Sequence, residues 1–154
     1  MTSDSGLGIG MTFISSIVLG FDIQQPRRIK CGAEMYEKLE PSSRRIRLLT
    51  LAPCSGSSQI RWELKPYLLD QSPKYEALSY TWGDPTTKGT IIINERPLLV
   101  ARNLLEAMQN LCHEQTGFTI WIDAICINQG NIKERNHQVG LMKDIYQNAS
   151  RVIV

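Results

Sequence analysis

The sequence has little net charge, no long apolar run and no closely spaced cysteine pair, and each absence excludes a class of protein. Seventeen basic residues stand against 15 acidic ones, so the formal net charge is +2, which is too small to predict nucleic-acid binding. Residues 7–21 are apolar but broken by glycine and serine, whereas a membrane-spanning helix needs about 20 apolar residues. No membrane span is therefore expected. The segment before them contains Asp4 and no Lys or Arg, which does not match a secretory signal.

The four cysteines, Cys31, Cys54, Cys112 and Cys126, lie far apart in the sequence. A disulfide framework is typical of smaller and denser secreted chains, so free thiols in a reducing compartment, and hence a cytoplasmic protein, are expected. The spacing does not match that of zinc ligands either, so no metal is predicted. The basic clusters at residues 27–30 and 44–47 are short and interrupted, which predicts solvated charge for both.

The chain is organised around one apolar strand and the polar stretch that follows it. Residues 118–122 are β-branched and aromatic and predict a buried strand, and Asp123 follows where that strand should stop. Asn131 then precedes Glu134 by three residues, which is the spacing of a helix cap, and a helix is predicted over residues 132–148. Because open α/β sheets bind ligands at the carboxyl ends of their strands, any chemistry is expected here.

The rest of the chain predicts two hairpins, two more strands and one helix. In chain order these are a hairpin of strands 45–51 and 59–64, a strand 75–82, a hairpin of strands 90–93 and 98–100, a helix 104–114 and a strand 151–154. Pro97 cannot donate to a ladder, so its strand is expected at an edge. Asn103, three residues before Glu106, repeats the capping arrangement. Together these elements predict an α/β fold: an open, partly parallel sheet flanked by helices, with an antiparallel hairpin extension on its N-terminal side.

Three segments of the chain follow from these patterns. Residues 1–35 show no sustained period and are expected to form a flexible leader. Residues 36–74 contain the first hairpin and a connector, and residues 75–154 form the main domain. Because the last strand has nothing after it to close the sheet, the main domain is expected to be truncated at its C-terminal end.

Three sequence blocks carry a family resemblance. They read Y-E-A-L-S-Y-T-W-G-D at residues 75–84, W-I-D-A-I-C-I-N-Q at residues 121–129 and E-R-N-H-Q-V-G-L-M at residues 134–142. In order and spacing they resemble the signature blocks of the fungal heterokaryon incompatibility (HET) domain, and residues 36–69 resemble the segment that usually precedes it. Three long blocks in register are far more specific than one short motif.

The resemblance implies a protein of filamentous fungi that acts in vegetative incompatibility, a self/non-self recognition system in which the domain triggers programmed cell death. It implies partners among other incompatibility or NLR-type signalling proteins, or self-association. Through analogy of fold, it also implies a Toll/interleukin-receptor-like, flavodoxin-like arrangement, no firmly bound cofactor, and NAD as a candidate substrate. Similar sequences continue past residue 154, which again indicates a truncated domain.

Three acids are the candidate catalytic residues: Asp123, Glu134 and Asp84. Carboxylates that share one crevice divide into acid and base, because each shifts the proton affinity of the other. Each also has a structural alternative. Asp123 can cap the turn that follows it, Glu134 stands at the third position of a helix cap, and Asp84 belongs to a Gly-Asp-Pro turn.

Five more residues are candidate binding residues near these acids: Trp82, Gly83, Asn128, Gln129 and Arg135. The two amides either hydrogen-bond a nucleotide or satisfy the backbone of a tight loop. Arg135 lies in the first turn of a helix, where anions are favoured, and an ion pair to Glu106 or Asp123 is its structural alternative. Cys126 with His137 as base is a further nucleophile hypothesis, against which the isoleucines beside Cys126 argue.

The sequence leaves three functional hypotheses open. The first is a death-signalling domain that works by association with a partner or with itself. The second is an enzyme of the NAD or nucleotide glycohydrolase type, with the three acids about the crevice. The third is an inactive fragment of a longer HET protein.

Overall fold

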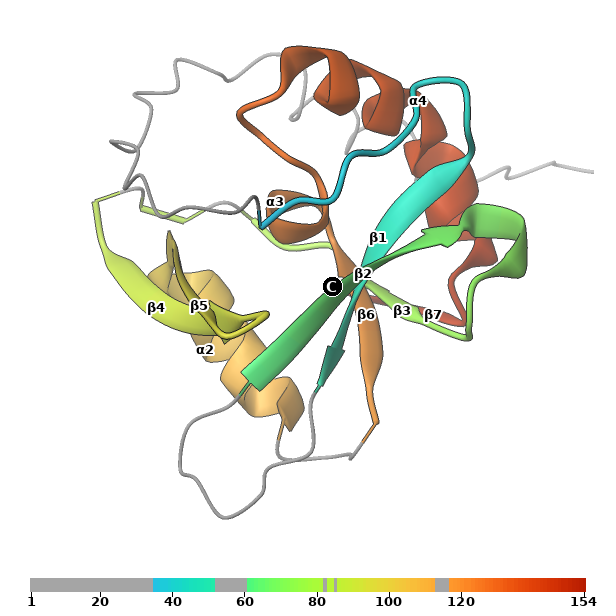
Figure 1. Cartoon of the computed structure of the whole chain (residues 1–154). Coiled ribbons are helices and arrows are strands. Elements are labelled where there is room, and N and C mark those ends of the chain that lie inside the picture. Colours follow the sequence, from blue (N-terminus) through green and yellow to red (C-terminus); the bar gives the residue numbers. More distant parts are fainter. Residues whose placement is uncertain (1–34, 52–60, 82, 85, 113–116) are drawn as a thin grey trace, which may run out of the picture. The chain divides into compact units, whose positions relative to one another are not determined.

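The computed structural model describes residues 35–51, 61–81, 83–84, 86–112 and 117–154. They belong to one compact unit, Glu34–Val154 (Figure 1). The predicted flexible leader, the start of the strand predicted at residue 59, and Trp82 lie outside the described residues. Among those that are described, no helix is long and apolar enough to cross a membrane.

A mixed sheet of seven strands lies at the centre of the described part of the chain, in the order β5-β4-β2-β1-β6-β3-β7. The strands are β1 (Arg45–Leu51), β2 (Arg61–Leu68), β3 (Glu76–Leu78), β4 (Lys88–Ile93), β5 (Arg96–Ala101), β6 (Thr119–Ile122) and β7 (Arg151–Ile153). Strand β3 pairs in parallel with both β6 and β7, whereas β1 pairs antiparallel with β2 and with β6. The predicted open, partly parallel α/β sheet is therefore confirmed. Its likeness to the flavodoxin-like arrangement stays a prediction.

Both predicted hairpins are confirmed by the strand pairing of β1 with β2 and of β4 with β5. In β2, Trp62 and Leu64 are buried while Arg61 and Glu63 are exposed, because successive side chains of a strand point to opposite faces. Strand β5 occupies an edge of the sheet, as Pro97 predicted. The turn between β4 and β5 has two residues with positive φ, Asn94 and Glu95, the conformation that a tight hairpin turn requires.

Three α-helices accompany the sheet among the described residues: α2 (Arg102–Cys112), α3 (Asp123–Cys126) and α4 (Ile132–Asn148). A short 3-10 turn, η1 (Leu69–Gln71), follows β2. Helix α2 packs against β4 and β5 (Figure 1), so closely that a Cβ built on Gly89 would overlap Cδ2 of Leu105. Helix α4 buries Leu141, Met142 and Ile145, which makes it the covering helix predicted over residues 132–148.

Two predictions about local structure are wrong. The strand predicted over residues 75–82 pairs only over β3, because the chain then turns towards α2, where the side-chain amide of Asn103 donates a 2.6 Å hydrogen bond to the carbonyl of Thr81. The aromatic and β-branched residues of this segment favour side-chain packing, and this preference does not by itself mean that the backbone pairs with another strand. Asn103 is also not a capping residue, because α2 begins at Arg102, and Glu106 forms an ion pair with Arg102 instead.

Candidate functional site

The carboxyl ends of three parallel strands meet at one edge of the sheet. Leu78 of β3 pairs with Ile122 of β6 and with Ile153 of β7, so the residues that follow these strands emerge together. The N–H of Ser79 donates a 2.8 Å hydrogen bond to the carbonyl of Ile153 at this edge. Asp123 follows β6 directly, and the sequence prediction placed the crevice here because ligands bind at such edges.

Asp123 is buried, with 8% of the residue exposed. Its carboxylate accepts a 2.7 Å hydrogen bond from the N–H of Ala124, and its carbonyl accepts one of 2.9 Å from the side-chain amide of Gln129. The carboxylate therefore binds a local N–H at the start of α3, as the structural alternative predicted, although the N-cap residue of that helix is Ile122 and no side chain caps it. The side chain of Gln129 thus binds a backbone carbonyl of its own loop, which is the structural alternative predicted for Asn128 and Gln129.

Two tyrosines, Tyr80 and Tyr146, lie close enough to Asp123 to respond to its charge. Burial, and after it the negative charge of Asp123, raises the pKa of Tyr146 to about 12, and the same two causes raise the pKa of Tyr80. The ring of Trp121 meets that of Tyr146 edge to face, with centroids 5.4 Å apart. Trp121 is fully buried, and its indole N–H has no hydrogen-bond partner in the described part of the chain. Asp123 thus has two phenols near it, and the ring of Trp121 packs against one of them, that of Tyr146.

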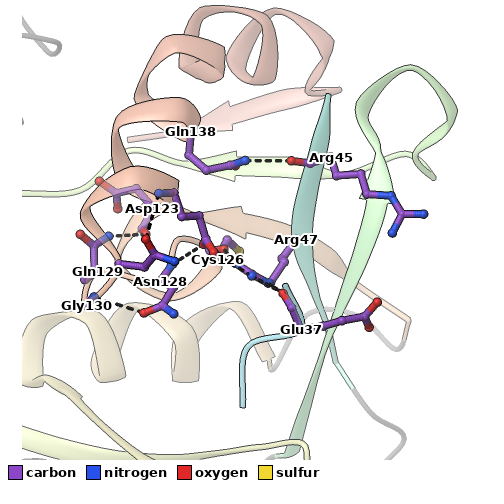
Figure 2. A network of polar contacts seen from close by, with 11 residues as sticks. Glu37, Arg45, Arg47, Asp123, Cys126, Asn128, Gln129, Gly130 and Gln138 are labelled. Atoms are coloured by element: carbon purple, nitrogen blue, oxygen red, sulfur yellow. Dashed lines mark hydrogen bonds and ion pairs between the residues drawn. The ribbon is translucent and has the colours of Figure 1, made fainter. Parts of the chain in front are cut away.

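Glu134 lies in a second polar group around Arg47, of which Figure 2 labels Arg47, Glu37 and Cys126. Its side chain is 7% exposed and forms an ion pair with the guanidinium of Arg47 at 2.5 Å. The same carboxylate accepts a 2.8 Å hydrogen bond from the N–H of Asn128. The backbone N–H of Glu134 donates to the side chain of Asn131 at 3.2 Å, so the predicted helix cap at Asn131 is confirmed. The carboxylate itself binds Arg47 and the loop rather than the cap.

Arg47 is the residue that sequence reasoning missed. It was predicted as solvated charge, and this is wrong, because only 1% of it is exposed. Its guanidinium donates to the carbonyls of Glu37 and Cys126 and lies over the ring of Tyr36, 5.1 Å from the centroid. No signal in the sequence indicated this burial, because alternation of Arg47 with Ile46 and Leu48 would predict an outward-facing arginine.

Two candidate residues of the first signature block, Gly83 and Asp84, are described, and the contacts of both are with residues other than Asp123 and Glu134. Asp84 is exposed, and its carboxylate accepts hydrogen bonds from the N–H and hydroxyl of Thr86, which lower its pKa. This is the turn role predicted for Asp84. Gly83 lies against α2, where an added Cβ would come 2.8 Å from the side chain of Asn103. Trp82 lies outside the described residues, so only Gly83 and Asp84 of the three candidates in this block can be placed.

The remaining candidates divide between core and helix surface. Cys126 is fully buried, and burial raises the pKa of its thiol to about 12, so the nucleophile hypothesis lacks a reactive thiolate. The imidazole of His137 is 3.0 Å from the carbonyl of Ser43, on another part of the chain. Arg135 is half-buried in the first turn of α4. Among the described residues, no group of three His, Cys, Asp or Glu side chains is placed to hold a metal ion.

Residues 75–154 match the family model described as Heterokaryon incompatibility protein (HET). The chain therefore belongs to the HET family, and the resemblance of its three sequence blocks is confirmed. It is similar to the Neurospora crassa protein named Heterokaryon incompatibility protein 6, OR allele, with 35% identity over 130 residues. That alignment covers 75% of this chain and 19% of the relative, so the chain spans about a fifth of that protein's length. No solved structure matches the chain.

Proposed function

We propose that this chain is an effector domain of heterokaryon incompatibility, which couples the recognition of non-self to programmed cell death. In this proposal it acts in the cytoplasm by association, either with other incompatibility or NLR-type signalling proteins or with further copies of itself. Membership of the HET family supports the proposal. So does the name of the Neurospora crassa relative, which is that of an incompatibility protein.

One observation favours association over catalysis. The carboxylate of Glu134, from the third signature block, is almost fully buried and is bound by Arg47 and by the N–H of Asn128. A side chain that acts on a substrate must come within hydrogen-bond reach of it, whereas this one binds the protein's own backbone and core. This contact gives Glu134 a structural role and joins the second block to the third. A domain whose signature residues are structural is expected to function by binding a partner.

The experiment is inducible expression of the chain in a filamentous fungus, with uptake of a vital dye as the measure of cell death. The wild-type chain is expected to kill. The control is Ile120→Asp, which places a charge at a position that is 0% exposed and prevents folding. Survival of cells that contain the folded wild-type chain would contradict the proposal. Equal killing by the Ile120→Asp variant would also contradict it, because the toxicity would then not require the fold.

A second candidate is a glycohydrolase that acts on NAD or a related nucleotide. It is favoured by the place of Asp123, beside Tyr80 and Tyr146 at the carboxyl edge of three strands. In that reaction water adds to C1′ of the ribose and the bond to nicotinamide breaks. The carboxylate of Asp123 would stabilise the positive charge that builds on the ribose ring.

The two candidates predict different results for the purified chain mixed with NAD. The enzyme releases nicotinamide, and Asp123→Asn abolishes both that release and the killing of cells. The associating domain leaves NAD intact, and Asp123→Asn still kills. Because Asp123 accepts a hydrogen bond from Ala124 and the amide oxygen of Asn can accept the same bond, this variant keeps the turn and separates the two functions.

A further inference from the structure

We propose that Arg47 is the positioning residue for the connection between β6 and α4, residues 123–131, which carries Asp123 to the edge of the sheet. It follows that the HET unit of this chain works only together with residues 36–51, which lie outside the matched range 75–154. The inference rests on the function proposed above, because that connection holds most of the second signature block.

The side chain of Arg47 serves three acceptors at once. Its guanidinium donates to the carbonyl of Cys126 at 3.2 Å and to the carbonyl of Glu37, as Figure 2 shows. It also donates to the carboxylate of Glu134. A guanidinium offers five N–H donors in a fixed plane, whereas an ammonium is a point charge on a flexible stem. Only arginine therefore holds these three groups in one fixed arrangement.

The backbone groups that Arg47 holds lie at the end of α3. Arg47 binds the carbonyl of Cys126 directly, and through Glu134 it holds the N–H of Asn128 at 2.8 Å. These two groups stand on either side of Ile127, at the point where the chain leaves α3. Fixing both determines how the backbone turns there. The turn then continues through Asn128, whose carbonyl and side-chain oxygen accept hydrogen bonds from the N–H groups of Asn131 and Gly130.

Burial makes the connection depend on the ion pair. The side chains of Arg47 and Glu134 are 1% and 7% exposed, and a buried charge that loses its partner is strongly unfavourable. The connection therefore keeps this conformation only while the pair is intact. The chain offers a contrasting pair on its surface: Arg61 and Glu95 are 2.7 Å apart, with side chains 46% and 74% exposed. Exposed pairs of this kind contribute little.

The segment before residue 75 covers the pair. The ring of Tyr36 lies against the guanidinium, and burial raises the pKa of its phenol although the charge of Arg47 opposes the shift. Further along the same segment, the carbonyl of Arg45 accepts a hydrogen bond from the side-chain amide of Gln138 in α4. The carbonyl of Ser43 contacts the imidazole of His137, also in α4. The segment before residue 75 therefore contacts the third signature block directly.

Amide hydrogen exchange of the whole chain tests the proposal, with Arg47→Lys as the variant and Arg61→Lys as its matched control. Arg47→Lys keeps the buried charge and loses the planar fork. Exchange at the N–H groups of Asn128, Gly130 and Asn131 should become at least about tenfold faster, because local opening of a segment is controlled by its own contacts. Exchange in the sheet should stay unchanged, and Arg61→Lys should change neither. Faster exchange spread evenly over the sheet, or no change at Asn128, would overturn the proposal.

A second pair of variants keeps the test decisive if Arg47→Lys folds poorly. Arg47→Met leaves the carboxylate of Glu134 buried without its partner, and adding Glu134→Gln removes that charge while keeping an acceptor for the N–H of Asn128. The double variant should melt at a higher temperature than Arg47→Met alone. Equal melting temperatures would contradict a specific pairing. These results do not depend on cell death, so a wild-type chain that fails to kill would contradict the proposed function and leave the positioning role to be decided by exchange.

Discussion

The hydroxyl of Tyr75 donates a 2.6 Å hydrogen bond to the backbone carbonyl of Ile145, which joins the residue before β3 to the end of α4. Tyr75 is 2% exposed, and burial raises its pKa to about 12. The same carbonyl accepts a 3.2 Å hydrogen bond from the N–H of Ala149, so the phenol is its second donor. The first signature block and the helix that carries the third are therefore tied together by a single side chain.

Replacement of Tyr75 by Phe removes this bond and keeps the ring. The variant should lose about 1 kcal/mol of unfolding free energy, the usual contribution of one hydrogen bond inside a protein. Urea denaturation measures it. Tyr67→Phe is the control, because the hydroxyl of Tyr67 makes no hydrogen bond within the described residues. Equal stability of Tyr75→Phe and the wild type would show that the contact contributes nothing.

Alkaline pH should destabilise the domain over a defined range. Burial raises the pKa of Cys126, Tyr75 and Tyr146 to about 12, from ordinary values of 9.0 for the thiol and 10.0 for the phenols. The unfolded chain therefore loses these protons first, and unfolding becomes more favourable as the pH rises. The contribution of these three groups to stability should be constant below pH 9 and fall between pH 9 and 12. Urea midpoints across this range measure the effect, and Tyr146→Phe should reduce the slope. A flat profile would contradict the burial of these groups.

The cap at the start of α4 predicts a smaller effect. The side chain of Asn131 accepts a 3.2 Å hydrogen bond from the N–H of Glu134, and replacing such a residue by alanine costs about 1 kcal/mol. Asn131→Ala should lower the stability by that amount in urea denaturation. Asn136→Ala, an exposed position within the same helix, should be neutral or slightly stabilising, because alanine is the better helix former. The same loss in both variants would rule out a capping role.

Two glycines predict opposite results for the same substitution. Gly140 is exposed within α4, and an added Cβ would meet nothing within 4 Å, so Gly140→Ala should stabilise the domain by about 0.5–1 kcal/mol. A Cβ on Gly89 would overlap Cδ2 of Leu105, so Gly89→Ala should force the Leu105 side chain to move and cost about 1 kcal/mol or more. Thermal melting of both variants measures the difference. Destabilisation by Gly140→Ala would contradict the helical conformation at that position.

Sequence patterns predicted much of the architecture because the decisive signals are local. The alternation in Trp62–Leu64, the edge role of Pro97 and the cap at Asn131 each depend on a few neighbouring residues, and all three are confirmed. The strand predicted over residues 75–82 was too long, since a contact with α2, which no local pattern reveals, draws the chain away after β3.

The site was harder to predict, since its main contact joins residues distant in the sequence. The three acids were interpreted from their own neighbourhoods, whereas the partner of Glu134 is 87 residues away in the chain. Arg47 resembled surface charge because it follows Arg44 and Arg45. Only the pairing of β1 with β6 brings it to the connection after β6. Burial of a charge is a property of the assembled sheet and cannot be predicted from a cluster of basic residues.

The most direct test of a structural role for the third signature block is the unfolding free energy of Glu134→Gln, measured in urea beside Glu106→Gln. Breaking a buried ion pair costs about 3–5 kcal/mol, so Glu134→Gln should lose that amount or fail to show a cooperative transition. Glu106 pairs with Arg102 at 3.2 Å on the surface, with a side chain 60% exposed, so its variant should stay within about 0.5 kcal/mol of the wild type. If Glu134→Gln also stays within about 0.5 kcal/mol, its carboxylate does not hold the fold, and the structural role of the third signature block is contradicted.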